Sequence, residues 1–382
     1  MKNIALICEY NPMHNGHIYQ INKIKEIYPD SNIIAIMSSS FVQRGEPSVL
    51  NKFDKARIAV ENGIDLVIEM PTIISVQSAN FFAYYNILIL DKLKLIDYLA
   101  FGIEEENEEI FLNTVDNILD NKDSISKLQK KYIDEGLSYK KSYLNALNDL
   151  NIDSKILEKP NNTLALQYIL ALKELNSSIQ YFPIHRKEYD NYNNKFRSST
   201  EIRKLYDSGE DYKYSVPKNT YDALINKYKL DDYSELFYYL AEIDKKNPSD
   251  TPNYENGMLN LLLKNYTGRL TDSIEKSHNK RYSKSRLQRF VINYILNIKN
   301  EDIENLKYIN YIRPLQFNDA GASILKEIKE KENIEIIQNI SKFTENPINQ
   351  RFLDIDRIAY KFHNIYHYDL LSKDYTYNPY KK

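Results

Sequence analysis

The chain has 382 residues, of which 42% are hydrophobic and 27% charged, a balance that excludes an intrinsically disordered protein. At roughly 150 residues per domain, this length predicts two or three domains. The 51 basic and 53 acidic residues give a net charge of −2, which excludes nucleic-acid binding through overall positive charge and requires any polyanion to be held by a local basic patch.

The first predicted element is a short buried strand at Ile4–Cys8. This apolar run is shorter than the roughly 7 to 15 residues of a signal-peptide core, and no later stretch reaches the roughly 20 apolar residues of a membrane span. Cys8 is the single cysteine, which excludes an intramolecular disulfide and a cysteine zinc cluster. We therefore expect a cytoplasmic protein without a membrane span.

Strands and helices alternate through the first half of the chain. Continuous Val/Ile/Leu-rich runs that alternate with helices are typical of a parallel sheet covered on both faces. The sequence therefore predicts an α/β domain with a doubly wound parallel sheet. The predicted strands are Ile4–Cys8, Ile33–Met37, Leu66–Ile68, Tyr98–Phe101 and Ile179–Ile184, and the main predicted helices are Ile18–Tyr28, Phe53–Asn62, Val76–Leu93 and Asn161–Leu175.

The second half, from about Pro217, shows helical periodicity almost everywhere, with one weak strand signal near Tyr308–Ile312. The composition of Tyr189–Lys195 and Asp207–Val216 is typical of a linker. We therefore expect two domains, a catalytic α/β domain over residues 1–210 and a mostly α-helical domain over residues 211–382.

The first candidate site directly follows the first predicted strand. In open α/β sheets, ligands bind outside the carboxyl ends of the strands, where the next helix offers free N–H groups to phosphate. His14 and His17 lie three positions apart at such a helix start, and Gly16 allows phosphate to approach the backbone. We expect both histidines to be catalytic, donating hydrogen bonds to α-phosphate oxygens in the transition state.

A second candidate site is the segment Phe196–Arg203. Ser198 or Ser199 can cap a helix whose free N–H groups hold pyrophosphate, and Arg203 adds positive charge one turn later. An ordinary helix cap with Glu201 in the first turn is the alternative interpretation.

These two motifs resemble the HxGH and Ser-Ser-Thr-x-x-Arg signatures of the nucleotidyltransferase superfamily. Longer blocks, such as Phe41–Pro47, Asp65–Pro71 and Lys280–Tyr282, resemble the bacterial tRNA(Met) cytidine acetate ligase family over nearly the whole chain. The resemblance implies a Rossmann-like nucleotidyltransferase domain that activates acetate with ATP as acetyl-adenylate. The acetyl group is then transferred to N4 of the wobble cytidine of elongator tRNA(Met). Mg²⁺ is implied as the companion of ATP, with metal ligands unassigned.

The resemblance also implies which residues bind ATP. Together with the pyrophosphate segment, they are Ile7, Cys8, Glu9, Tyr10, Asn11, Pro12, Met13, His14, Asn15, Gly16, His17, Ile18, Tyr19, Gln20, Gly102, Asn162, Arg186, Lys187, Ser198, Ser199, Thr200 and Arg203. From the residues alone, Gly102 could be a turn glycine, Asn162 a helix cap and Arg186 a surface arginine.

Two further segments are candidates for contact with the acetyl acceptor. Between Lys276 and Arg289 the chain has no acidic residue, so this run is either a solvated basic face or a patch that contacts phosphates, and the family resemblance favours contact with tRNA. Gln43 and Arg44 follow the second strand and could hold acetate or the cytidine. The basic residues expected to bind tRNA are Lys276, Lys280, Arg281, Lys284, Arg286 and Arg289.

Two other functions fit part of these observations. The chain could be an adenylyltransferase acting on a small phosphorylated coenzyme precursor, but the basic run opposes this. It could instead be a non-catalytic RNA-binding protein, which the intact His14, His17 and Arg203 oppose. The oligomeric state is not predicted by the sequence.

Overall fold

The structure is a computed structural model that describes residues 1–105, 107–186, 196–224, 228–340 and 344–380. Lys187 and the predicted linker at 189–195 lie outside these ranges. In the first half, the elements are β1 (Asn3–Cys8), α1 (Asn15–Ile27), β2 (Asn32–Ser38), α2 (Lys52–Glu61), β3 (Leu66–Met70), α3 (Thr72–Ser75), α4 (Ala79–Leu93), β4 (Tyr98–Ile103), α5 (Glu108–Asp120), α6 (Lys122–Asp134), α7 (Tyr139–Asp149), α8 (Pro160–Glu174) and β5 (Gln180–His185).

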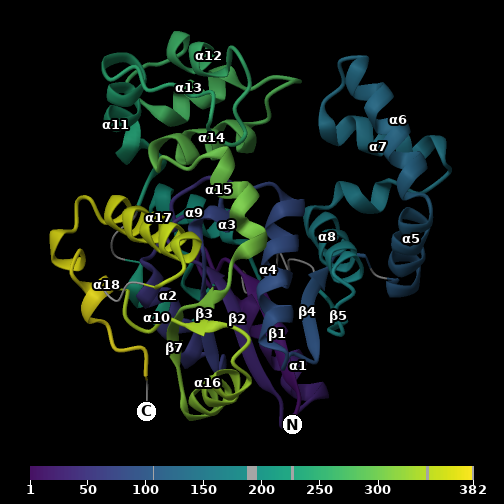
Figure 1. The fold of residues 1–382 in the computed structure, drawn as a ribbon, viewed down its shortest axis with the longest axis vertical. Helices are drawn as coiled ribbons and strands as arrows, with labels where there is room; N and C mark the ends of the chain where they lie inside the picture. The colour runs from purple at the N-terminus through teal and green to yellow at the C-terminus, as the bar shows by residue number, and fades with distance from the viewer. Residues whose placement is uncertain (106, 187–195, 225–227, 341–343, 381–382) are drawn as a thin grey trace.

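The second half is mostly helical, as the sequence predicts. Its helices are α9 (Ser199–Ser208), α10 (Lys218–Ala223), α11 (Ser234–Tyr238), α12 (Met258–Lys264), α13 (Leu270–Ser277), α14 (Lys284–Ile295), α15 (Asn300–Glu304), α16 (Asp319–Lys331), α17 (Pro347–His363) and α18 (Lys373–Thr376). Its strands are β6 (Tyr311–Ile312), β7 (Pro314–Phe317) and β8 (Glu335–Ile336). Figure 1 shows α11–α14 gathered at the top of the molecule, away from the sheet.

The central sheet has the strand order β5-β4-β1-β2-β3-β7, and its first five strands are parallel. Alternate residues of β2 face opposite sides: Ile34 and Ile36 pack in a core with residues of α4 and α8, while Ile33 and Met37 pack with residues of α1 and α2. All four side chains have no exposed surface. A sheet buried on both faces explains the continuous apolar runs and confirms the predicted doubly wound fold.

The sixth strand comes from the second half of the chain. β7 pairs antiparallel with β3, with Leu66 opposite Phe317 and Val67 opposite Gln316, and it covers the edge that β3 would otherwise leave unpaired. The sequence predicted no strand here. The weak strand signal near Tyr308–Ile312 corresponds instead to β6, which pairs with β8 in a separate small sheet.

A buried ion cluster fixes the C-terminal segment to the sheet. The Lys52 ammonium contacts Glu69 at 2.9 Å and Asp374 at 2.7 Å, and Arg313 contacts the same two carboxylates at 2.9 Å each. All four side chains are at most 4% exposed. Removing one partner would leave an uncompensated buried charge, which typically costs about 3 to 5 kcal/mol.

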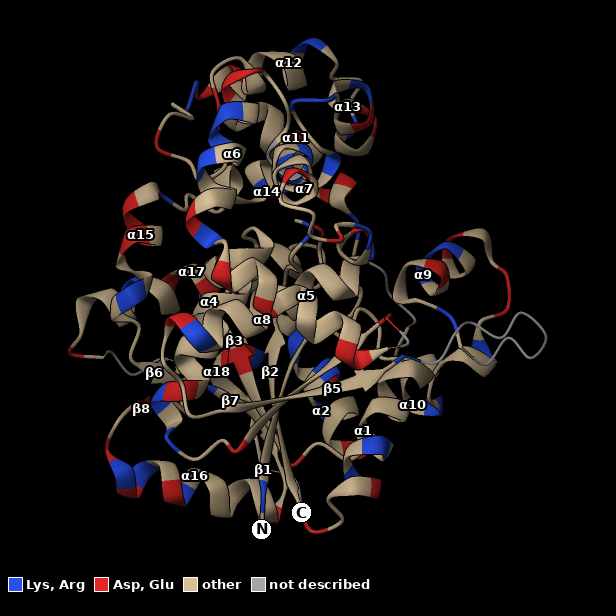
Figure 2. Ribbon diagram, turned by 90° about the vertical axis from the view of Figure 1, so that its right-hand side faces the viewer, with Lys and Arg blue, Asp and Glu red and all other residues tan. Residues whose placement is uncertain are grey.

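Charged residues of both signs are distributed over the helices that surround the sheet (Figure 2). Within the described ranges, no helix combines the length and the apolar character that a membrane crossing requires. Groups of three His, Cys, Asp or Glu side chains arranged to hold a metal ion are also not found among the described residues.

Candidate active site

The loop between β1 and α1 holds His14 and His17 rigidly at the carboxyl edge of the sheet. His14 is the N-cap of α1, where its Nδ1 accepts a hydrogen bond from the Gly16 N–H at 3.1 Å. The backbone N–H of His14 donates in turn to Nδ1 of His17, also at 3.1 Å. The two rings are stacked with their centroids 3.8 Å apart. A side chain on residue 16 would place its Cβ 2.9 Å from the His14 ring, so this geometry requires glycine.

The protonation state of the two imidazoles follows from these bonds. Burial and the nearby Arg186 charge lower the pKa of His14 to about 3, and burial, His14 and Arg186 lower the pKa of His17 well below its usual value. Both rings are therefore neutral at pH 7. Because each Nδ1 accepts a backbone N–H, each ring carries its hydrogen on Nε2. The pair thus presents two neutral N–H donors at the start of α1, an arrangement suited to phosphate oxygens.

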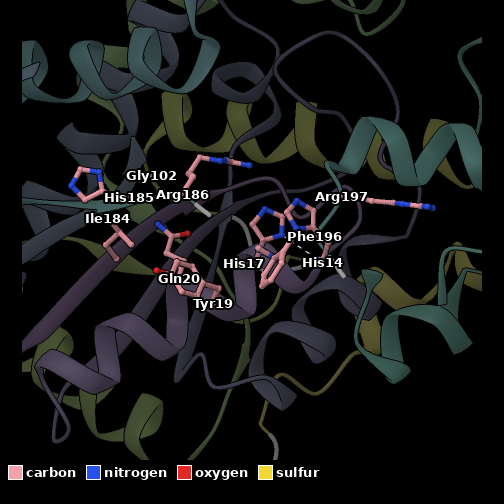
Figure 3. Close-up of a pocket in the computed structure, with 11 residues that line it drawn as sticks. His14, His17, Tyr19, Gln20, Gly102, Ile184, His185, Arg186, Phe196 and Arg197 are labelled. Carbon is pink, nitrogen blue, oxygen red and sulfur yellow. Dashed lines mark hydrogen bonds between the residues drawn. The ribbon is translucent and has the colours of Figure 1, made fainter. Parts of the chain in front are cut away.

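A small pocket with a cavity volume of about 50 Å³ lies beside the imidazoles. Figure 3 shows the Arg186 side chain extending toward the imidazole pair, whereas His185 and Arg197 point away from it. The lining residues are His14, Gly16, His17, Tyr19, Gln20, Gly102, Ile184, His185, Arg186, Phe196 and Arg197.

Two contacts position the Arg186 side chain, one with Asn161 in α8 and one with Gly102 in β4. Its Nη1 donates to Oδ1 of Asn161 at 3.0 Å. Its aliphatic stem lies over Gly102 at the end of β4, where an added Cβ would be 3.1 Å from Cγ of Arg186. Gly102 therefore provides room for the arginine, which distinguishes it from an ordinary turn glycine.

The second predicted motif docks directly onto the first. Ser198 is the N-cap of α9 and forms a capping box with Glu201. Ser199 donates to the carbonyl of Pro12 at 3.1 Å, and Nη1 of Arg203 donates to the carbonyl of Asn11 at 2.7 Å. Residues almost 200 positions apart in the chain thus contact each other beside the pocket, although none of these four lines it.

Several residues predicted to bind ATP support the loop rather than line the pocket. Oδ1 of Asn11 accepts from the Val49 N–H at 2.7 Å, and the side chains of Tyr10 and Met13 are buried. Asn162 is fully buried, accepting from the Glu104 N–H at 2.7 Å and donating to the Ile156 carbonyl at 3.0 Å. These two hydrogen bonds fix the start of α8, where the neighbouring Asn161 accepts from Arg186. The ATP contacts of all these residues stay predictions, and Lys187 lies outside the described residues.

The predicted acetate or cytidine residues lie in the loop after β2. The Gln43 N–H donates to Oε1 of Glu9 at 2.6 Å, whereas Arg44 is exposed. Burial raises the pKa of Glu9, and this hydrogen bond opposes the increase. Neither Gln43 nor Arg44 lines the described pocket.

Four pocket-lining residues were not predicted to bind ATP, although the last two begin the second candidate segment. They are Ile184, His185, Phe196 and Arg197. Ile184 and His185 end the strand that precedes Arg186, so their position at the carboxyl edge of a predicted strand was the available signal. Phe196 and Arg197 directly precede the predicted helix cap, but nothing in the local sequence shows that they approach α1.

The basic segment Lys276–Arg289 spans the end of α13, the following loop and the start of α14. Arg281 and Arg286 both pair with Glu255, the latter at 3.0 Å, and Lys284 pairs with Glu275 at 2.9 Å. Glu275 directly precedes the run, whereas Glu255 lies about 20 residues earlier, so the run itself does not reveal these partners. Lys280 is exposed, and burial lowers the pKa of Arg289 to about 10. The segment therefore contains cations paired with carboxylates, such as Arg286, and exposed cations, such as Lys280, for which the described part of the chain shows no ion pair.

Comparison with known proteins places this geometry in a family. The HIGH Nucleotidyl Transferase family model matches residues 1–378. The chain is 32% identical to tRNA(Met) cytidine acetate ligase of Halothermothrix orenii, with 98% of this chain and 94% of that protein covered. It is 33% identical to the enzyme of the same name from Clostridium novyi, with 99% and 97% covered.

The fold agrees with that of a solved structure. The crystal structure of Thermotoga maritima TmcAL bound with alpha-thio ATP matches with a TM-score of 0.89 and 25% identity, covering 100% of this chain and 99% of that one. The extent of these matches, together with the paired histidines and the docked α9 segment, establishes the family. The chain belongs to the tRNA(Met) cytidine acetate ligase family of HIGH nucleotidyltransferases.

Proposed function

We propose that the protein joins acetate to tRNA(Met) in two steps, using ATP. The first step forms acetyl-adenylate and pyrophosphate, and the second transfers the acetyl group to N4 of the wobble cytidine in the elongator tRNA. The observation that carries the proposal is the pair of neutral Nε2–H donors at the start of α1, beside a pocket that also holds Arg186. Family membership supports the choice of acetate and tRNA(Met).

The first half-reaction creates the electrophile. A carboxylate oxygen of acetate forms a bond to the α-phosphorus of ATP, and the bond between that phosphorus and the bridging oxygen of pyrophosphate breaks. His14 and His17 donate to α-phosphate oxygens, whose charge increases in the transition state, and Arg186 stabilises the same charge. Pyrophosphate leaves toward the start of α9. The neutral imidazoles require no proton transfer, so catalysis depends on placement and electrostatics.

The second half-reaction consumes the mixed anhydride. The N4 amine of cytidine is a weak nucleophile because its lone pair is delocalised into the ring, so the carbonyl must be activated beforehand. The amine attacks the acetyl carbonyl carbon, the bond to the adenylate oxygen breaks, AMP leaves and the amine loses one proton. Mg²⁺ enters the proposal as the counter-ion of the triphosphate, and no step is assigned to it.

The two parts of the chain divide these tasks. We assign residues 1–210 to ATP and acetate, and residues 211–382 to tRNA docking through the basic segment, with β7 of the second part completing the sheet. In this proposal, the exposed cations of this segment bind phosphates of the anticodon arm. Such contacts would position the RNA without reading its sequence.

Pyrophosphate exchange with a panel of small acids tests the proposal. Exchange of labelled pyrophosphate into ATP should require acetate and should not require tRNA. Product formed with a phosphorylated coenzyme precursor would instead indicate an adenylyltransferase. Retained tRNA binding without any turnover would indicate a non-catalytic RNA-binding protein.

A further inference from the structure

The loop that follows β2, residues 41–47, is attached to both motifs of the nucleotide site. Its Gln43 N–H donates to Glu9 at the end of β1, at 2.6 Å. Oε2 of Glu46 accepts from Nη2 of Arg203 at 3.3 Å. Since Arg203 also donates to the carbonyl of Asn11, the position of Glu46 is linked to the loop that carries the paired histidines.

The other side of the same loop lies against the basic segment. Oε1 of Glu46 accepts from Nε2 of Gln288 in α14 at 3.2 Å, and Gln288 is only 5% exposed. Gly45 has φ of +75°, and a Cβ there would lie 2.5 Å from the Arg289 nitrogen and from the Gln288 carbonyl carbon. The loop therefore packs against the backbone of α14, where only glycine fits.

We propose that Glu46 is a positioning residue that holds tRNA bound on α14 at the correct distance from the adenylate. One carboxylate oxygen of Glu46 accepts from Arg203 in α9 and the other accepts from Gln288 in α14, so the same side chain connects the two helices. This inference rests on the proposed function. Acyl transfer requires the amine and the carbonyl carbon to lie about 3 to 3.5 Å apart, so a small movement of α14 relative to the pocket is costly.

The hydrogen bond between Glu46 and Gln288 lies next to residues of the basic segment, which connects it to RNA binding. Gln288 lies between Arg286 and Arg289, two cations of the basic segment. Arg286 pairs with Glu255 and Arg289 is largely buried, so RNA phosphates would be held by the exposed cations that precede them, such as Lys280. Force on these cations would act on the start of the helix that Glu46 holds. The Glu46–Arg203 pair is partly shielded from solvent, with side chains 28% and 19% exposed, so it keeps more strength than a surface ion pair.

Gln288→Met tests the inference because it removes the hydrogen bond to Glu46 while keeping the size of the side chain. We expect acetate-dependent pyrophosphate exchange to stay within about twofold of the wild type. The single-turnover rate of acetyl transfer at saturating tRNA should fall about tenfold, with the KM for tRNA nearly unchanged, because bound RNA is misplaced rather than lost.

Tyr294→Phe is the matched control on the same helix. It removes the hydrogen bond from Tyr294 to the carbonyl of Lys246, 2.6 Å long, which involves no residue of the loop. The inference is overturned if Gln288→Met leaves transfer unchanged, if it lowers exchange and transfer equally, or if Tyr294→Phe lowers transfer as much. Failure of the wild type to exchange pyrophosphate with acetate would overturn the proposed function itself, so the two failures are distinguishable.

Discussion

The nucleotide pocket and the basic segment hold their polar groups in opposite ways. In the pocket, His14 is 3% exposed and both imidazoles are neutral, each fixed by a backbone N–H. In the basic segment, Lys280 is exposed and Arg281 is paired with Glu255.

This difference corresponds to two kinds of task. Stabilising charge at one phosphorus atom requires donors that are already oriented and shielded from water, whereas holding an RNA backbone requires charge spread over a flexible surface. Substitutions in the pocket should therefore affect the chemical step, and substitutions in the basic segment should affect salt-dependent binding. Four experiments could break or sharpen this division.

The largest effect is expected from His17→Ala. Removing one oriented donor from the α-phosphate should lower acetate-dependent pyrophosphate exchange by about 100-fold to 1,000-fold. Binding of tRNA, measured by filter retention, should stay within about twofold, because the basic segment is untouched.

His185→Ala is the control for this substitution, since His185 lines the pocket but points away from the imidazole pair (Figure 3). It should retain exchange within about threefold. Equal losses in the two variants would show that the oriented pair has no special role.

The next effect concerns Lys280→Ala combined with Arg281→Ala. Adenylate formation should be retained, whereas acetyl transfer at limiting tRNA should fall on the order of tenfold, with a weaker dependence on salt. The single Lys280→Ala change should account for most of the loss, because Glu255 already compensates part of the charge of Arg281.

Two lysines on α16 provide a charge-matched control. Lys326→Ala with Lys329→Ala removes the same net charge from exposed positions outside the basic segment, and transfer should be unchanged. If exchange failed in the Lys280 and Arg281 variant as it does in His17→Ala, the division between the two regions would be wrong.

A smaller effect is expected from Gly102→Ala. The added Cβ would lie 3.1 Å from Cγ of Arg186 and would displace its stem, raising the KM for ATP about fivefold with little change in the KM for tRNA. Steady-state kinetics in ATP and in tRNA give the comparison. Equal changes in the KM for ATP and the KM for tRNA would indicate general destabilisation.

The smallest effect concerns pH and stability. The pKa of His14 is about 3 in the folded protein against about 6.5 in the unfolded chain, so between these values only the unfolded chain binds the proton. The contribution of His14 to stability is present above pH 6.5 and is lost as the pH falls toward 3, with a loss of less than about 1 kcal/mol between pH 7 and pH 6.

Urea unfolding at the two pH values measures this contribution. His14→Gln should lose less stability between pH 7 and pH 6 than the wild type. Between pH 7 and pH 6, the rate of pyrophosphate exchange should not fall through protonation of His14 or His17, because burial keeps both pKa values below this range.

The sequence predicted the five parallel strands because four of them, β1 to β4, are apolar runs buried on both faces, and the edge strand β5 still carries the apolar residues Phe182 and Ile184. It could not predict β7, because Pro314–Phe317 is a four-residue edge strand whose pairing depends on contact with β3, almost 250 residues earlier. Short edge strands carry little periodic signal.

The site shows the same limit. His14, Gly16 and His17 were predictable because they follow the first strand closely, at the cap and first turn of α1. The contacts of Arg203 with Asn11 and Glu46, and of Arg281 with Glu255, join distant segments and leave no local pattern. Local motifs thus identified the chemistry, whereas the connections between motifs required the fold.

The antiparallel strand β7 has a consequence for synthesis on the ribosome. The five parallel strands are complete once β5 has emerged, but the β3 edge has no partner until residues 314–317 follow, more than 100 residues later. During that interval the nascent chain displays an open strand edge, a known template for aggregation. We expect a fragment ending near residue 210 to be poorly soluble and to be rescued by supplying the remaining residues in trans.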